Sequence, residues 1–311
     1  MKFSVIIPLY NKRNHIKETI SSVIQQSFED FELIIVDDGS TDDGLELVNT
    51  FSDNRIKIFE QKNSGVSVAR NLGINKSSGE FICFLDADDL WNHDYLHEIN
   101  KLTMMFNESD IFVTAYKVDL PNNKVNYSKG NLESNKYGIS NYWSEINNKY
   151  EFVWTSATTV RKRALKESGL FKPGENIGQD LHFFSKLARI NSRVAFTEKV
   201  CVTYNRMAEN NARTRIKLAY APAYMEVLKE EINNSSRSKK ELSNIKSKFD
   251  FKMIAYIYTM CLSGDRLKAR EIIKEWDCRK KNVPYKFGLY VASLMPHSIL
   301  KIVYGIRLKI F

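Results

Sequence analysis

The chain has 311 residues, 43% of them hydrophobic, which is enough to bury a substantial core and excludes a largely disordered protein. Its formal charge of +9 would suit a nucleic acid or an anionic membrane. However, seven basic residues and no acidic one lie between residues 279 and 311, and the rest of the chain is nearly balanced. This distribution argues against a nucleic-acid partner bound across a whole domain.

The four cysteines lie far apart and form no Cys-x-x-Cys pair, so neither a zinc site nor a disulfide framework is predicted. The apolar run that begins at residue 3 is too short for a signal peptide, and no segment is clearly long and uncharged enough to span a bilayer. We therefore expect a cytoplasmic protein with reduced thiols, with attachment to the inner face of the cell membrane as an open alternative.

Short apolar runs alternate with amphipathic stretches along the first third of the chain, which is typical of an α/β fold with a mostly parallel sheet flanked by helices. The run before Asp86 is short and continuously apolar, as expected of a buried strand. We expect strands at residues 3–7, 31–36, 55–59, 81–85, 111–118, 152–160 and 193–204. We expect helices at residues 13–26, 42–51, 64–75, 95–106 and in the second half of 169–190.

Two later regions lack this alternation of short apolar runs and amphipathic stretches. Residues 121–150 are rich in Asn, Ser and Lys, which indicates a loop-rich insertion. From residue 216 onward the apolar period is helical, with a polar break at 233–239. We predict an α/β domain at residues 1–215, with halves at about 1–118 and 119–215, and a helical C-terminal extension at 216–311.

Polar side chains follow three of the predicted strands. They are Tyr10 with Asn11, the segment 37–40, and the acidic cluster, which we define as Asp86 to Asp89. Ligands of open α/β sheets bind beyond the carboxyl ends of the strands. The three strand ends are therefore predicted to face one crevice.

The acidic cluster contains an Asp-x-Asp motif. In an extended backbone Asp86 and Asp88 point the same way, and two convergent carboxylates suit Mg2+ or Mn2+ bound together with the phosphates of a nucleoside diphosphate. The alternative is that these acids cap the following helix, a role that we expect for Asp89. Taken alone, the short motif favours the capping alternative.

Four segments in order make the N-terminal half resemble the family 2 glycosyltransferases. They are SVIIPLYN (4–11), ELIIVDDGSTD (32–42), NSGVSVARN (63–71) and GEFICFLDADD (79–89). The resemblance implies a GT-A fold with a nucleotide-sugar half before residue 118 and an acceptor half after it. It weakens beyond Leu90.

The resemblance also implies roles for the matching residues on the donor side. Pro8 and Tyr10 would pack on the nucleotide base, and Asp38 would accept a hydrogen bond from its edge. Arg70 would lie near the base or the diphosphate. Asp86 would face the ribose, and Asp88 would hold the metal, Mn2+ or Mg2+. Structural alternatives stay open: Tyr10 as a strand-end aromatic, Asp38 as a cap of the turn into the helix at Asp42, and Arg70 as a surface ion pair with a carboxylate.

On the acceptor side, inverting transfer needs a general base. The family places an acidic residue of a Glu-Asp pair there, and the matching segment is GQDLHFF (178–184). Asp180 would be the base, while Gln179 replaces the Glu, which leaves the neighbouring contact in doubt. Asp180 could also cap its helix, and His182 has no evident chemical partner.

Residues 285–311 mix aromatic and aliphatic side chains with basic ones. This composition fits an amphipathic segment on an anionic membrane, or equally a helix that packs on the catalytic domain with a solvated basic edge. Pro296 divides the segment, so one long helix is not expected. With the membrane interpretation, the acceptor would be a lipid-linked saccharide.

The resemblance thus implies an inverting glycosyltransferase of cell-surface polysaccharide synthesis. Its donor would be a UDP-sugar, as is usual in the family, and its acceptor a saccharide. One alternative is a nucleotidyltransferase of sugar activation, but the Gly-rich phosphate loop usual after its first strand is missing from residues 8–13. Another is a non-catalytic partner subunit, although Asp88 and Asp180 are both present. A Rossmann dehydrogenase is disfavoured because no Gly-x-Gly-x-x-Gly follows the first strand.

Overall fold

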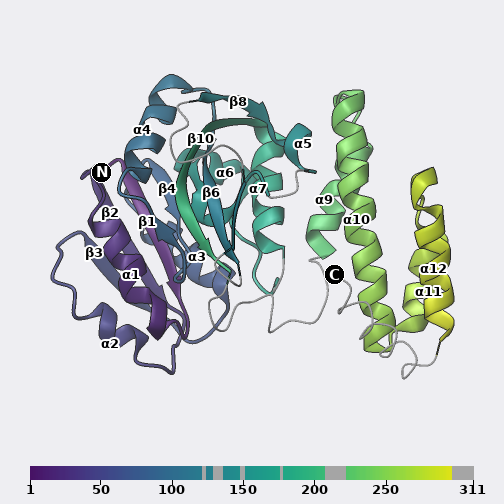
Figure 1. Ribbon diagram of the computed structural model, residues 1–311, viewed down its shortest axis with the longest axis horizontal. Helices are drawn as coiled ribbons and strands as arrows, with labels where there is room; N and C mark the ends of the chain where they lie inside the picture. Colours follow the sequence, from purple (N-terminus) through teal and green to yellow (C-terminus); the bar gives the residue numbers. More distant parts are fainter. Residues whose placement is uncertain (121–123, 129–135, 148–150, 176–177, 207–221, 296–311) are drawn as a thin grey trace. The chain divides into compact units, whose positions relative to one another are not determined.

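The computed structural model describes residues 1–120, 124–128, 136–147, 151–175, 178–206 and 222–295. The chain forms two compact units, Met1–Arg215 and Ile216–Phe311. Among the described residues, the first unit holds a ten-stranded sheet with helices packed on it, and the second is helical (Figure 1). The α/β class expected from the sequence is confirmed. The boundary expected near residue 216 falls outside the described ranges.

One half of the sheet is parallel. Nearly every side chain in its central strands is buried, as expected of strands that are covered on both faces. In spatial order this half contains β3 (Ile56–Glu60), β2 (Phe31–Asp37), β1 (Phe3–Leu9) and β4 (Phe81–Phe84).

The other half is mixed. β9 (Thr158–Arg161) enters antiparallel between β4 and β6 (Ile111–Leu120), and β10 (Arg193–Asn205) runs parallel to β6. The sheet is therefore wholly parallel from β3 to β4, while beyond β4 the parallel pair β6 and β10 is combined with antiparallel strands. Three short strands complete the sheet: β5 (Leu90–Trp91), β7 (Lys124–Tyr127) and β8 (Tyr137–Asn141).

Helices cover both faces of the sheet (Figure 1). α3 (Val66–Lys76) packs on β1 and β2, and this approach requires Gly73, because a Cβ there would lie 2.5 Å from Cγ2 of Ile6. α4 (Tyr95–Met105) packs on β6 and β10. The other helices of this unit are α1 (Arg13–Ile24), α2 (Gly44–Val48), α5 (Tyr142–Glu145), α6 (Leu165–Ser168), α7 (Gln179–Ile190), η2 (Thr155–Ala157) and η3 (Lys162–Ala164).

Two sequence expectations were wrong in detail. The strand expected at 152–160 begins only at Thr158, because the 3-10 helix η2 precedes it. The region 121–150 is not only loop, since its described part contains β7, β8 and α5. Among the described strands β7 pairs only with β6, and β8 only with β10, so neither carries the apolar run of a central strand.

The second unit is stabilised by a buried carboxylate. Asp250 accepts hydrogen bonds from Nε1 of Trp276, Nε of Arg279 and Nδ2 of Asn282, which joins the long helix to the segments after it. None of the described helices combines the length and the apolar composition that a bilayer crossing requires. The helices here are α9 (Pro222–Ile232), α10 (Lys239–Ser263), α11 (Arg266–Glu275), η4 (Lys280–Asn282) and α12 (Val283–Leu294).

Candidate functional site

The carboxyl ends of β1, β2 and β4 meet at one edge of the sheet. β1 lies between the other two and is parallel to both, with Leu9 opposite Asp37 and Ile6 opposite Phe84. The polar segments that follow these strands are therefore brought to the same edge, as the sequence predicts. This is where open α/β sheets bind ligands.

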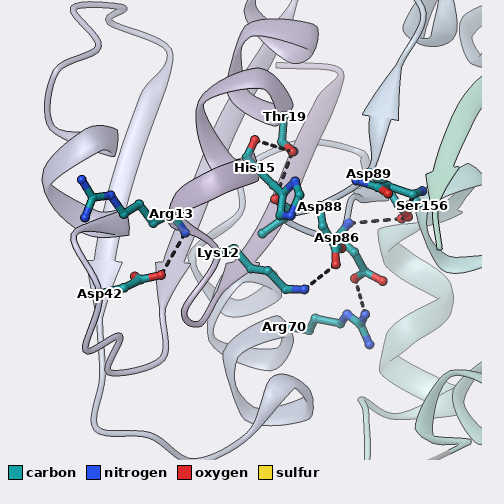
Figure 2. Close-up of polar contacts among 12 residues, drawn as sticks. Lys12, Arg13, His15, Thr19, Asp42, Arg70, Asp86, Asp88, Asp89 and Ser156 are labelled. Carbon is teal, nitrogen blue, oxygen red and sulfur yellow. Dashed lines mark hydrogen bonds and ion pairs between the residues drawn. The ribbon is translucent and has the colours of Figure 1, made fainter. Parts of the chain in front are cut away.

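Each aspartate of the Asp-x-Asp motif contacts a basic side chain from another element (Figure 2). Nη2 of Arg70, on α3, donates to Oδ1 of Asp86 at 2.5 Å. Nζ of Lys12, just before α1, donates to Oδ2 of Asp88 at 2.5 Å. Nε and Nη1 of the buried Arg70 have no hydrogen-bond partner in the part of the chain that the structure describes. Because unpartnered buried donors are costly, this guanidinium is a candidate anion-binding group.

Asp89 does not cap a helix, contrary to the sequence expectation. It is buried, and its carboxylate accepts hydrogen bonds from Oγ of Ser156 at 2.6 Å and from the backbone N–H of Asn205 at 3.0 Å. Oγ of Ser156 also accepts from the backbone N–H of Asp86 at 3.1 Å (Figure 2). Asp89 therefore anchors the acidic cluster to η2 and β10.

The electrostatics of the acidic cluster follow from burial and crowding. Burial raises the pKa of Asp88, the Lys12 ammonium opposes that shift, and the Asp86 carboxylate adds to it. Burial also raises the pKa of Asp89 well above its ordinary value, with further contributions from Asp88 and Asp86. Three carboxylates so close together favour either protonation of one of them or the binding of a cation.

The carboxylates of the acidic cluster are potential oxygen ligands of a divalent metal. Within the described ranges no group of three or more His, Cys, Asp or Glu side chains could hold a metal ion. Mg2+ needs no such cage, because it is usually bound by one or two carboxylates plus substrate phosphates, and Mn2+ prefers the same oxygen ligands. Asp86 and Asp88 fit a site of this open kind.

Asp38 fixes the start of the helix that carries Arg70. Its buried carboxylate accepts hydrogen bonds from Nε2 of Gln61 at 2.7 Å and from the backbone N–H groups of Ser64 and Gly65 at 2.8 Å. The cap expected as an alternative, toward the helix at residue 42, is not formed.

Pro8 and Tyr10 are half-buried at the end of β1. Asn11 follows in the left-handed region, with φ 52, and its Oδ1 accepts from the backbone N–H of Thr41 at 2.7 Å. Asn tolerates this conformation better than most residues. The turn at Asn11 leads the chain into α1 and places Lys12 beside the acidic cluster.

Asp180 lies in the first turn of α7. Gly178 occupies the N-cap with φ 79, and Oδ1 of Asp180 accepts from the backbone N–H of Leu181 at 2.8 Å. Burial raises the pKa of Asp180, Arg70 lowers it and Asp86 raises it. Asp180 is therefore within electrostatic range of both members of the Arg70–Asp86 pair.

An aromatic cluster, which we define as Phe84, Phe171, Phe183 and Phe184, joins β4 to α7. Phe84, two residues before Asp86, packs edge-to-face on Phe171 and Phe183 with centroids 5.4 and 5.7 Å apart. Phe171 stacks on Phe183 at 3.9 Å. This packing sets the spacing between the acidic cluster and Asp180.

Three contacts of the site were not predicted from the sequence. Lys12 could have been noticed, as a basic residue directly after a polar strand end. Ser156 carries no local signal, because its segment reads as a strand. His182 was expected to have no chemical partner, but its Nδ1 lies 3.0 Å from Oε2 of Glu175, and burial lowers its pKa.

The fold and the strand-end site define an α/β protein with a candidate ligand site at the carboxyl edge of its parallel strands. The sequence model described as Glycosyl transferase family 2 matches residues 4–169, more than half of the chain. The chain therefore belongs to glycosyl transferase family 2, which confirms the resemblance seen in the four segments.

Curated relatives come from several bacteria. Glycosyltransferase GlyA of Streptococcus pneumoniae is 32% identical over 218 residues, 65% of this chain and 30% of that protein. Minor teichoic acid biosynthesis protein GgaA of Bacillus subtilis is 32% identical over 199 residues, 60% of this chain and 43% of that protein. The chain spans less than a third of the length of several curated relatives that it matches, 16%, 30% and 31% for three of them.

Among solved structures, S. aureus TarS 1-349 in complex with UDP-GlcNAc has a TM-score of 0.65 to this chain. The match covers 95% of this chain and 82% of that one at 20% sequence identity. At this identity the likeness is one of fold. It confirms the expected GT-A-like architecture.

Proposed function

We propose that the protein is an inverting, metal-dependent glycosyltransferase that moves a sugar from a nucleoside-diphosphate donor to a saccharide hydroxyl. One observation carries this proposal: Arg70 binds Asp86, has two buried donors without a partner among the described residues, and lies within electrostatic range of Asp180. The proposal thus has an anion-binding guanidinium in Arg70, a candidate base in Asp180 within electrostatic range of it, and a cation-binding carboxylate in Asp88, two residues after Asp86. Displacement of a diphosphate by a hydroxyl needs all three.

On the donor side, Asp88 would hold Mn2+ or Mg2+ and Asp86 would face the ribose. The cation supplies Lewis-acid stabilisation of the charge that develops on the leaving diphosphate. Nε and Nη1 of Arg70 donate to diphosphate oxygens, and these charge-assisted hydrogen bonds strengthen as the negative charge grows.

The base subsite would be formed by residues that follow β1 and β2. Pro8 and Tyr10 stand half-buried at the strand end, where an aromatic face can pack on a nucleotide base. Asp38 already holds the start of α3, and each carboxylate oxygen can accept more than one hydrogen bond. We propose that it also accepts from the edge of the base.

On the acceptor side, Asp180 would act as the general base. It removes the proton from the acceptor hydroxyl as the new carbon–oxygen bond forms and the bond to the diphosphate breaks on the opposite face. A raised pKa suits this task, because a carboxylate that titrates nearer neutral pH binds the proton more strongly.

The donor is proposed to be a UDP-sugar, since the TarS complex holds UDP-GlcNAc and the fold is shared. The acceptor is proposed to be a cell-surface polysaccharide precursor, in line with the teichoic acid named for GgaA.

We further propose that this acceptor is lipid-linked and that the protein attaches to an anionic membrane face. α12 supports attachment, because it exposes the apolar side chains of Val283, Tyr285, Phe287 and Leu294 directly after the exposed Lys280 and Lys281 of η4.

Calorimetry with UDP in the presence and absence of Mn2+ tests the donor side. Asp88→Asn should remove the Mn2+ dependence, while Asp180→Asn should bind UDP normally and show no transfer in a screen of UDP-sugars. Asp43→Asn, at an exposed position, is the control. Equal UDP affinity of the parent and the Asp88→Asn protein at saturating Mn2+ would refute the metal assignment. Normal donor binding without transfer in the parent would instead indicate a non-catalytic subunit.

A further inference from the structure

Lys12 and Arg70 both pair with the acidic cluster, but they are held differently. Arg70 is buried, its guanidinium lies 5.2 Å from the ring centroid of Phe171, and its plane is fixed by packing. Lys12 reaches Asp88 with the tip of a flexible four-carbon side chain that is 13% exposed. Of the two, Lys12 can leave its aspartate without disturbing the core.

The backbone of Lys12 is held by hydrogen bonds, whereas its four-carbon side chain has several rotatable bonds. Its carbonyl oxygen accepts hydrogen bonds from the N–H groups of His15 and Ile16 in the first turn of α1. The residue before it is held in turn by the hydrogen bond between Asn11 and Thr41. The backbone from which the Lys12 side chain extends is therefore fixed at the edge of the sheet.

Asp88 cannot bind Lys12 and a divalent cation equally well at the same time, because its carboxylate is only 14% exposed and leaves little room for a second ligand. A cation that arrives alone adds positive charge beside Lys12 and Arg70, and like charges repel. A cation that arrives with a nucleoside diphosphate also brings phosphate oxygens, which attract an ammonium. The two ligands together thus offer Lys12 a second partner.

We propose that Lys12 makes cation binding conditional on the donor: it pairs with Asp88 in the donor-free enzyme and shifts to the diphosphate when cation and nucleotide bind together. The inference rests on the proposed function, since it takes Asp88 as a ligand of the cation. It implies that Mn2+ alone binds weakly and that Mn2+ and UDP strengthen each other's binding. Coupling between two ligands is commonly about 5- to 150-fold.

The test measures Mn2+ binding by paramagnetic resonance, without nucleotide, at pH 8, where protonation of Asp88 competes least. Lys12→Met should bind Mn2+ alone about tenfold more tightly than the parent, and should bind UDP at saturating Mn2+ about tenfold more weakly. A residue with only a structural role would weaken both. Unchanged Mn2+ affinity, or unchanged UDP affinity, would overturn the proposal.

Two further variants keep the result interpretable. Arg13→Met removes the adjacent positive charge, which is 57% exposed and paired with Asp43 at the surface, and should alter neither affinity. Lys12→Arg keeps the charge and should stay near the parent; behaviour like that of Lys12→Met would show that packing, not charge, matters and would overturn the proposal. If Asp88→Asn abolishes the Mn2+ dependence while Lys12→Met changes nothing, the proposed function stands and this inference alone fails.

Discussion

The side-chain amide of Asn71 makes two hydrogen bonds to the backbone of Phe171, 100 residues later in the chain: Nδ2 donates to the carbonyl at 2.8 Å, and Oδ1 accepts from the N–H at 3.0 Å. Asn71 follows Arg70 on α3, while Phe171 precedes the helix that carries Asp180. One amide therefore joins the helix that carries Arg70 to the segment before the helix that carries Asp180.

Asn71→Ala is expected to lower kcat by on the order of 10- to 100-fold, because a small displacement of a catalytic group has effects of this size. UDP affinity should change little, since Asn71 is not placed among the donor-binding side chains. Steady-state kinetics and calorimetry check the two parts. Asn75→Ala, at an exposed position on the same helix, is the matched control. A loss confined to UDP affinity would contradict the assigned role.

The acidic limb of the pH profile should report Asp180. Because its pKa is raised above 3.8, the carboxylate is protonated at a higher pH than an ordinary aspartate, and a protonated base cannot accept the acceptor's proton. We expect kcat/KM to fall as the pH drops toward this raised pKa. Glu151 raises the pKa further, so Glu151→Gln should move the limb to lower pH. A limb that moves upward, or a profile flat down to pH 4, would exclude Asp180 as the base.

Glu32 is expected to contribute stability through its hydrogen bonds. Burial raises its pKa, but Lys57, Ser4 and Ser78 donate to it and together bring the pKa from 4.5 to about 2. The folded state thus favours the ionised form of Glu32. The stability that Glu32 contributes is complete above about pH 4.5 and is lost as the pH falls toward 2.

Glu32→Gln should therefore lower the free energy of unfolding by about 2 kcal/mol at pH 7, the usual size for hydrogen bonds to a charged group. The difference from the parent should shrink at pH 3. Urea unfolding at the two pH values measures it, with Glu60→Gln, exposed at the end of β3, as the control. An equal loss at both pH values would contradict the ionic origin.

The exposed face of α12 predicts attachment to anionic lipid. Phe287 is 69% exposed, so Phe287→Ser should reduce flotation with vesicles that contain phosphatidylserine. Phe251→Ser is matched, since Phe251 is 62% exposed but lies on α10, and should float like the parent. Equal flotation of both variants would remove the membrane proposal for this helix. Flotation that does not depend on anionic lipid would also count against it.

The central strands could be predicted from the sequence because burial on both faces leaves a continuous apolar run, as in β1 and β2. The strand-end positions of Asp38 and Asp86 follow from the same runs. β7 and β8 could not be found in this way, because edge strands pair on one side and keep polar side chains. Their identity depends on partners in β6 and β10.

The polar contacts of the site were less accessible to sequence reasoning. Lys12 and Asp88 lie 76 residues apart, and Ser156 and Asp89 lie 67 residues apart, so nothing local encodes either pairing. The expected cap at Asp89 was wrong for this reason: capping is a local rule, and the carboxylate instead has distant partners. The roles assigned to the other site residues remain predictions.

The aromatic cluster around Phe84 bears on the proposed inverting transfer. Salt weakens ion pairs but does not screen contacts between aromatic rings. The aromatic packing between the strand before Asp88 and the helix of Asp180 should therefore not depend on ionic strength. Raising salt should therefore cost affinity for the charged donor while the stereochemical outcome stays constant. Strength of binding and fidelity of the anomeric configuration would then be separable properties of this chain.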